Sequence, residues 1–320
     1  MLTKSQLHEL YYWLLLTRTL EDRIVSLHRT GKIYGNFCTS RGQEAISVGT
    51  AFALQPDDII APMLRNMGAL LVRGIKPAEI LMQYMGRSAS PTGGRECSLN
   101  MGDLRRGIVA PIAVLGKLVP VVAGVAIAAR IRKLRVVALT YIGDGGASTT
   151  DFHEGLNLAA VRKAPMILVL ENNGWAFSTP TRMQTANPDY ITRAGAYGVA
   201  GTEVDGNDVL AVYEATRRLT EDVRAGRGTA LIVANTMRMN GDCGNGDAWY
   251  VPKDEIARWK SNDPIRRFEK YLDERAIITP GERDDLAARV RSEVDNATAA
   301  AVNCPFPEGQ RALGGVYHEG

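Results

Sequence analysis

Cysteine and histidine are scarce in this sequence, with four of each in 320 residues. The cysteines lie far apart, at positions 38, 97, 243 and 304, without a CxxC pair and without histidines at metal-ligand spacing nearby. Such isolated cysteines argue against a disulfide framework and against a zinc site. We therefore expect reduced thiols in a cytoplasmic protein.

Long apolar runs and a strong net charge are also missing. The apolar stretches 11–16 and 118–129 are too short to cross a bilayer, and charged residues follow the first of them at once. The 38 basic and 35 acidic residues leave a net charge of +3, which is too small and too mixed to indicate binding to nucleic acid or to a membrane surface. We expect no nucleic-acid partner and no membrane partner.

The chain does contain enough apolar material for a sizeable core, at 45% of its residues. Apolar residues at helical spacing alternate with short unbroken β-type runs, which predicts parallel βαβ units. The pattern predicts helices over 4–30, from 43, and over 66–73, 77–85, 119–130, 152–163, 208–225, 264–275 and 280–301. It predicts strands over 135–142, 166–170, 202–204 and 229–236, and long loops over 86–107 and 237–252.

The predicted fold is therefore α/β with a parallel sheet, in a single domain over residues 1–320. A helical N-terminal extension is expected over about 1–45, the core over about 46–237, and a C-terminal loop with helices over about 238–320.

Two turns predicted at the carboxyl ends of strands carry the candidate chemistry. Gly143-Asp-Gly-Gly146 follows the first predicted strand, and Asn172-Asn-Gly174 follows the second. Ligands of open parallel sheets bind beyond these strand ends, and glycines allow a close approach of the backbone to an anion. Asp144 and Asn173 offer hard oxygen ligands, which suit Mg²⁺ or Ca²⁺ bridging to phosphate. Either turn alone is an ordinary loop, but the two together are a specific signal.

The GDG and NN pair resembles the thiamine-diphosphate motif, and further segments extend the likeness over about residues 5–275. These segments are GQEA (42–45), APMLR (61–65), DFHE (151–154), ENN (171–173), VDGND (204–208) and DPI (263–265). Together they resemble the alpha subunit of the thiamine-diphosphate-dependent dehydrogenase of 2-oxo acid dehydrogenase complexes, a family that includes acetoin dehydrogenase. The resemblance implies a thiamine-diphosphate-binding fold of the diphosphate type and an enzyme that decarboxylates a 2-oxo acid and passes on the acyl unit.

The resemblance also implies the cofactors, thiamine diphosphate and Mg²⁺, and the residues that bind them. These residues are Arg65, Leu115, Gly143, Asp144, Gly145, Gly146, Asn173 and Trp175. Asp144, Asn173 and the backbone carbonyl of Trp175 would hold Mg²⁺, and the glycine N–H groups would line the diphosphate. Arg65 would bind a phosphate, and Leu115 would lie near the aminopyrimidine. The alternatives are a surface cation for Arg65 and a core position for Leu115.

In this family a separate beta subunit grips the aminopyrimidine and supplies the activating glutamate. The resemblance thus implies an α₂β₂ assembly, inactivity of the isolated chain, and a lipoyl or other acyl carrier as a further candidate partner. Helix 152–163, with small residues at Gly155, Ala159 and Ala160, is a candidate packing face for that assembly, although the same pattern is typical of a core.

The chain departs from the family at positions where histidine is usual. Leu64 replaces Tyr or His, and Asn100 and Asn245 replace His. Asp242 stands where the second loop normally has a His, followed by Cys243 in place of Ser or Ala. An aspartate repels a diphosphate, whereas a histidine can donate to it, so the catalytic residues stay unassigned.

Three explanations remain open for these substitutions. The first is a reshaped loop in which Asp242 faces solvent. The second is a different reaction, a carboligation or acyl transfer of specialised metabolism, and the third is a non-catalytic scaffold. The intact GDG and NN pair argues against complete loss of function. We expect loops 86–107 and 237–252 to become ordered over the bound cofactor.

Overall fold

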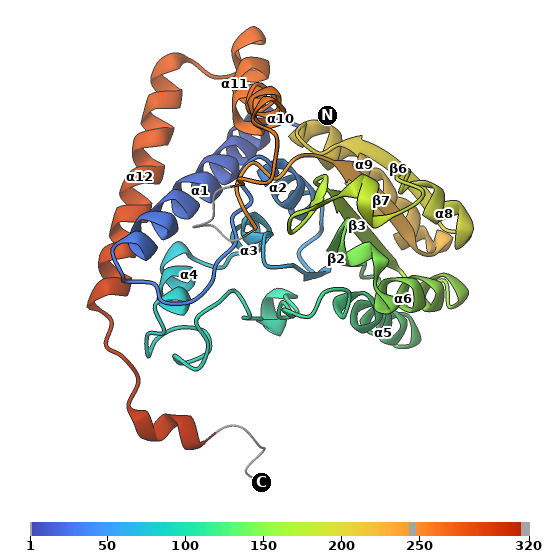
Figure 1. The fold of residues 1–320 in the computed structure, drawn as a ribbon, viewed down its shortest axis with the longest axis horizontal. Coiled ribbons are helices and arrows are strands. Elements are labelled where there is room, and N and C mark those ends of the chain that lie inside the picture. Colours follow the sequence, from blue (N-terminus) through green and yellow to red (C-terminus); the bar gives the residue numbers. More distant parts are fainter. Residues whose placement is uncertain (1, 243–247, 315–320) are drawn as a thin grey trace.

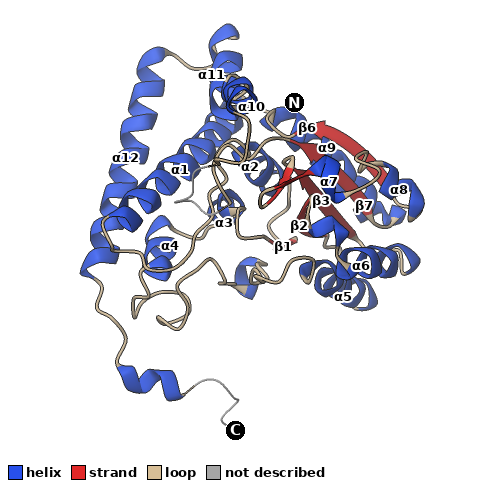
Figure 2. Cartoon of the chain, in the orientation of Figure 1, coloured by secondary structure: helices blue, strands red, loops and turns tan. Residues whose placement is uncertain are grey.

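The computed structural model describes residues 2–242 and 248–314, which form a parallel sheet covered by helices on both faces (Figures 1 and 2). The helices are α1 (Lys4–Arg29), α2 (Glu44–Phe52), α3 (Met67–Val72), α4 (Pro77–Tyr84), α5 (Leu118–Ile131), α6 (Thr150–Val161), α7 (Thr181–Gln184), α8 (Thr192–Ala196), α9 (Val209–Asp222), α10 (Lys253–Lys260), α11 (Pro264–Glu274) and α12 (Pro280–Asn303). The strands are β1 (Ile59–Ala61), β2 (Ala138–Gly143), β3 (Met166–Asn172), β4 (Trp175–Ala176), β5 (Thr179–Pro180), β6 (Ala200–Asp205) and β7 (Ala230–Asn235).

The main sheet has the strand order β1-β2-β3-β7-β6, and all of its neighbouring strands are parallel. This confirms the predicted α/β class with a parallel sheet. In the register, Gly143 of β2 pairs with Glu171 of β3, and Asn172 of β3 pairs with Asn235 of β7. The turns after β2, β3 and β7 therefore emerge side by side at one edge of the sheet.

The central strands β2, β3 and β7 are buried on both faces because they are mostly apolar runs, whereas the edge strand β6 is largely exposed. Along β3, Ile167 and Val169 belong to a core shared with α1, α3, α4, α9 and α12. The intervening Leu168 and Leu170 belong to a second core shared with α5 and α6. This alternation follows from the two-residue period of a strand. It fixes the turn residues that follow β3 relative to two packed layers.

The small residues of α6 are used within the chain. A Cβ added at Gly155 would lie 2.7 Å from the backbone nitrogen of Pro120 on α5, and Ala159 is fully buried in the same layer. These residues therefore allow α5 and α6 to pack closely, which is the core alternative for this helix. The exposed large apolar side chains of the two helices are Val121, Ile131, Leu158 and Val161.

The N- and C-terminal helices lie together along one side of the molecule (Figure 1). Tyr11 and Tyr12 of α1 donate hydrogen bonds of 2.7 Å to Glu269 and Glu293 of α11 and α12. Arg18 of α1 pairs with the buried Glu44 of α2 and reaches the α11 N-cap, Asp263, at 3.0 Å. These contacts join α1 to α2, α11 and α12.

Several short elements were not predicted. Strand β1 has only three residues and depends on pairing with β2, and the β4–β5 hairpin has two residues in each strand. Helices α7, α8 and α10 were also missed. The strand predicted over 135–142 begins later, at Ala138, because the N–H of Val137 is bound by the carboxylate of Asp58. Within the described residues, no helix is both long and apolar enough to span a membrane.

Candidate functional site

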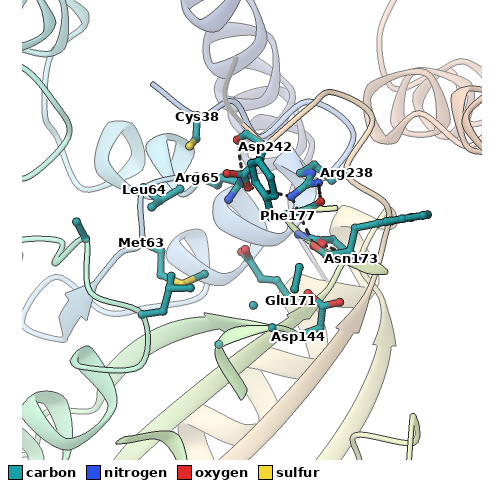
Figure 3. A pocket seen from close by; sticks show the side chains of 17 residues that line it. Cys38, Met63, Leu64, Arg65, Asp144, Glu171, Asn173, Phe177, Arg238 and Asp242 are labelled. Atoms are coloured by element: carbon teal, nitrogen blue, oxygen red, sulfur yellow. Dashed lines mark hydrogen bonds and ion pairs between the residues drawn. The ribbon is translucent and has the colours of Figure 1, made fainter. Parts of the chain in front are cut away.

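A cavity of about 430 Å³ lies beyond the carboxyl ends of β2 and β3. All eight residues expected to bind the cofactor line it: Arg65, Leu115, Gly143, Asp144, Gly145, Gly146, Asn173 and Trp175. Nine more complete its wall: Cys38, Met63, Leu64, Ala113, Glu171, Ala176, Phe177, Arg238 and Asp242. In Figure 3, Asp144 and Glu171 lie at the strand ends, and Arg65 and Asp242 lie across the cavity from them.

One wall of the cavity is built by the turns after β2 and β3. The N–H of Asp144 donates to the carbonyl of Glu171 at 3.3 Å, which ties the first turn to the second strand. Both Asp144 and Asn173 are buried, at 2% and 5% exposure. Their oxygens already meet donors, since Asp144 Oδ2 accepts from Thr181 at 3.1 Å and from Gln184 at 3.3 Å.

Opposing effects act on the pKa of the Asp144 carboxyl. Burial raises the pKa of its carboxyl, while the N–H of Gly145, the donors Thr181 and Gln184, and the charge of Arg238 oppose this. Because a buried carboxylate needs a strong cationic partner, this position favours a bound cation. The side-chain amide of Asn173 is held by the N–H of Trp175 at 3.3 Å.

Glycine is required where this turn meets its neighbours. A Cβ at Gly145 would lie 2.4 Å from the Cβ of Ala176, and one at Gly146 would lie 2.9 Å from Ile142. At Gly143, by contrast, an added Cβ would meet nothing within 4 Å. Gly143 thus leaves open space in the cavity wall, which a side chain at this position would fill.

The opposite wall is a charged cluster of Arg65, Arg238 and Asp242. Arg65 Nη2 donates to the Oδ1 and the backbone carbonyl of Asp242, at 2.8 and 2.5 Å. Arg238 Nη1 donates to the same Oδ1 at 3.0 Å. Burial and the nearby charge of Arg65 lower the pKa of Arg238. For Arg65, burial works in the same direction, but Cys38, Asp242 and Glu171 raise its pKa overall.

Glu171 and Arg238 line this cavity, although neither was predicted as a site residue from the sequence. Glu171 has the clearer local setting. It is 1% exposed, and its Oε1 accepts from Asn66 Nδ2 at 2.6 Å. Burial raises its pKa to about 7, against the opposing effects of Asn66 and Arg65. Its place directly before the NN pair was the available signal, since the strand register puts it opposite Gly143.

Phe177 and Cys38 were also missed. Phe177 has a left-handed backbone, with φ of 51°, and its side chain is 64% exposed at the cavity. Its carbonyl accepts from Arg238 Nη2 at 2.5 Å, which ties the strained turn to the charged cluster. Cys38 comes from the loop between α1 and α2, whose approach to the sheet edge has no local sequence signal.

The positions at which the family usually has histidine divide into two groups. Leu64 and Asp242 line the cavity, whereas Asn100 does not. The side chain of Asp242 is 31% exposed and pairs with two arginines, so the alternative in which a reshaped loop turns it to solvent is not what the structure shows. Cys243 and Asn245 lie outside the described residues. None of His8, His28 and His153 lines the cavity.

Comparisons with known proteins show the family of this chain. The family model described as "Dehydrogenase E1 component" matches residues 12–310. The chain is 34% identical to the 2-oxoisovalerate dehydrogenase subunit alpha of Bacillus subtilis (strain 168), over 99% of this chain and 96% of that protein. It is 35% identical to the pyruvate dehydrogenase E1 component subunit alpha of Staphylococcus aureus (strain N315), over 94% of this chain and 80% of that protein.

These relatives are dehydrogenase subunits, which favours the dehydrogenase over the carboligase and the non-catalytic scaffold. The chain belongs to the dehydrogenase E1 component family, as an alpha-type subunit of a thiamine-diphosphate-dependent 2-oxo acid dehydrogenase.

Proposed function

We propose that this chain anchors the diphosphate of thiamine diphosphate through Mg²⁺ held by Asp144, Asn173 and the backbone carbonyl of Trp175. The observation that carries this proposal is the meeting of two buried oxygen-bearing side chains, from the ends of neighbouring strands, in a cavity that also contains two guanidinium groups. Carboxylate, amide and carbonyl oxygens are the ligands that Mg²⁺ prefers, together with phosphate oxygens of the substrate or cofactor.

The unsatisfied groups of the cavity support a phosphate ligand. Among the described residues, the Nε atoms of Arg65 and Arg238 are buried without a hydrogen-bond partner. A buried donor without a partner is costly, and phosphate oxygens are the acceptors that guanidinium groups match best. The open space at Gly143 leaves room for such a ligand beside Asp144.

Each part of the cavity has a distinct proposed task. Bound thiamine diphosphate would supply the carbanion chemistry that releases carbon dioxide from a 2-oxo acid. Asp144 and Asn173 would hold the diphosphate end through the metal, Arg65 would bind a phosphate, and the N–H groups of Gly145 and Gly146 would line the diphosphate. The apolar side chains of Leu64 and Leu115 would line the other end, where Leu115 would lie near the aminopyrimidine.

We further propose that a beta subunit completes the site in an α₂β₂ assembly and supplies the activating glutamate. Apolar side chains near the cavity are unusually exposed, at 52% for Leu115, 58% for Val114 and 64% for Phe177, and such patches are typical of protein contacts. A lipoyl or other acyl carrier would receive the acyl unit. The names of the relatives point to a 2-oxo acid such as pyruvate or 2-oxoisovalerate as the substrate. We place the reaction in the cytoplasm.

The test is cofactor binding by the chain co-expressed with the beta subunit encoded nearest to it. Isothermal titration calorimetry with thiamine diphosphate and Mg²⁺ should show saturable binding to the wild-type complex. Asp144→Asn keeps the side-chain shape but removes the charge, and we expect it to weaken binding by about 100-fold or more.

Asp205→Asn is the matched control, since Asp205 pairs with Arg267 and does not line the cavity. Its binding should equal that of the wild type. A folded, stoichiometric complex that binds no cofactor would overturn the proposal. Equal binding by Asp144→Asn would overturn the role of Asp144.

A further inference from the structure

One carboxylate oxygen joins the two arginines of the cavity. Asp242 Oδ1 lies 2.8 Å from Arg65 Nη2 and 3.0 Å from Arg238 Nη1. The side chains of the two arginines are 14% and 3% exposed, so both cations are largely removed from water. The chain therefore brings its own anion to the two groups that are best suited to bind a phosphate.

The arginines do not depend on this carboxylate for their positions. Arg238 Nη2 also donates to the carbonyl of Phe177 at 2.5 Å and to the hydroxyl of Tyr250 at 2.7 Å. Arg65 Nη2 also donates to the backbone carbonyl of Asp242, which any residue at position 242 would retain. Removal of the carboxylate charge would thus leave both guanidinium groups in place.

The cluster is nevertheless incompletely satisfied. The Nε atoms of both arginines are buried and lack a partner among the described residues. One shared carboxylate oxygen cannot use all donors of two guanidinium groups, each of which has five N–H bonds. A diphosphate, with several oxygens and a larger charge, would satisfy these donors better than Asp242 does.

We propose that Asp242 is an internal counterion that competes with the diphosphate for Arg65 and Arg238, so that cofactor binding requires its displacement. This inference rests on the proposed function, because it assumes that the diphosphate binds in this cavity. The substitution at position 242 then sets the cofactor affinity of this chain below that of a chain with a neutral residue there. Asp144 and Glu171 contribute the same charges in either case, so the effect belongs to Asp242.

The test uses the full chain with Mg²⁺ and inorganic pyrophosphate as the probe, measured by isothermal titration calorimetry. Asp242→Asn should bind pyrophosphate about tenfold or more tighter than the wild type, because one negative charge a few ångströms from the ligand is lost. Asp242→His, measured at about pH 8 where histidine is neutral, should also bind more tightly. It decides the question if Asp242→Asn does not fold.

Asp295→Asn is the matched control, because Asp295 of α12 pairs with Arg23 and does not line the cavity. Its affinity should equal that of the wild type. Unchanged or weaker binding by the Asp242 variants would overturn the inference and make Asp242 a residue that positions the arginines.

A parallel titration of thiamine diphosphate into the complex with the beta subunit separates the two proposals. If the wild-type complex binds thiamine diphosphate and Asp242→Asn binds it no more tightly, only the proposal that Asp242 is a competing counterion is contradicted. Absence of binding to every variant contradicts the proposed function as well.

Discussion

Two buried clusters of arginine and aspartate lie at opposite edges of the same sheet. At the amino ends of β1 and β2, both oxygens of Asp58 accept from Arg224, at 2.6 and 2.8 Å. The same carboxylate also binds the N–H groups of Gln55 and Val137. At the carboxyl ends, Asp242 uses one oxygen for two arginines, and the Nε of each arginine has no partner in the part of the chain that the structure describes.

The two clusters differ in whether their hydrogen bonds are complete, which separates an ion pair that only stabilises the fold from one that is available to a ligand. Asp58 is fully buried and fully hydrogen-bonded, and its pair closes the edge of the sheet. Asp242 borders a cavity of about 430 Å³ and leaves donors unsatisfied. A buried ion pair whose hydrogen bonds are all made matters for stability chiefly because removal of one partner leaves an uncompensated buried charge. A pair with unused N–H donors can still bind an anionic ligand.

The largest expected effect is the loss of stability when the charge of Asp58 is removed, compared with the loss when the charge of Asp242 is removed. Asp58→Asn leaves the buried Arg224 without its anion and should lower the free energy of unfolding by about 3–5 kcal/mol. Asp242→Asn leaves both arginines their backbone or hydroxyl acceptors and should cost clearly less than Asp58→Asn. Urea unfolding followed by circular dichroism measures both. Equal losses in the two variants would contradict the distinction.

The second prediction concerns ligand binding by the unsaturated cluster. Arg238→Met fills a similar volume but removes a buried cation, and charge-assisted hydrogen bonds are worth about 1.5–3 kcal/mol. We expect binding of pyrophosphate with Mg²⁺ to weaken by about 10- to 100-fold. Arg267→Met, which alters an arginine outside the cavity, is the control. Unchanged affinity of Arg238→Met would remove Arg238 from the proposed site.

Glu21 extends the comparison to a buried carboxyl whose second oxygen has no hydrogen-bond partner among the described residues. Its Oε1 accepts from the N–H and the hydroxyl of Ser40, both at 2.7 Å. Burial, and then the charge of Glu44, raise its pKa from 4.5 to about 8. The folded state therefore holds a proton that the unfolded state releases, and stability should fall as the pH rises from about 5 to about 8.

The side chain of Glu21→Gln cannot ionise. The decrease in the free energy of unfolding between about pH 5 and pH 8 should therefore be smaller in this variant, by on the order of 2–4 kcal/mol. Urea unfolding of both proteins at several pH values in this range gives the slope. If the wild type and Glu21→Gln lose stability in parallel, the protonated state of Glu21 is not the cause.

The smallest effect is expected at an exposed ion-pair group. Arg217 on α9 contacts Glu214 and Glu221 at 2.5 and 2.6 Å, but all three side chains are well exposed. Exposed pairs contribute little because water and salt screen them. Arg217→Ala should leave the free energy of unfolding almost unchanged. A loss that rivals that of Asp58→Asn would show that burial is not the deciding variable.

The parts of the site that could be predicted are those with a local sequence signal. Strands β2 and β3 are unbroken apolar runs, and each ends in a glycine or asparagine turn. Parallel pairing then puts the two turns together without further information. Asp144 and Asn173 therefore reached the same cavity as expected, and the family resemblance added Arg65 and Leu115.

The unpredicted parts depend on contacts between distant segments. Arg65 and Asp242 are 177 positions apart, and no local pattern indicates that a substituted aspartate would find a cation there. Strand β1 has three residues and exists because Ile59, Ile60 and Ala61 pair with β2. Cys38 reaches the cavity from a loop held by side chains of α1 and α2. Long-range packing and ion pairing decided these positions.

The most direct measurement is a crystal structure of the complex with the beta subunit, grown with thiamine diphosphate and with Mn²⁺ in place of Mg²⁺. The anomalous signal of manganese locates the metal independently of the protein coordinates. We expect a peak bound by Asp144, Asn173 and the carbonyl of Trp175, with the diphosphate beside Arg65 and the carboxylate of Asp242 displaced from it. A metal peak elsewhere in a cofactor-loaded complex would show that these strand-end turns do not hold the cofactor.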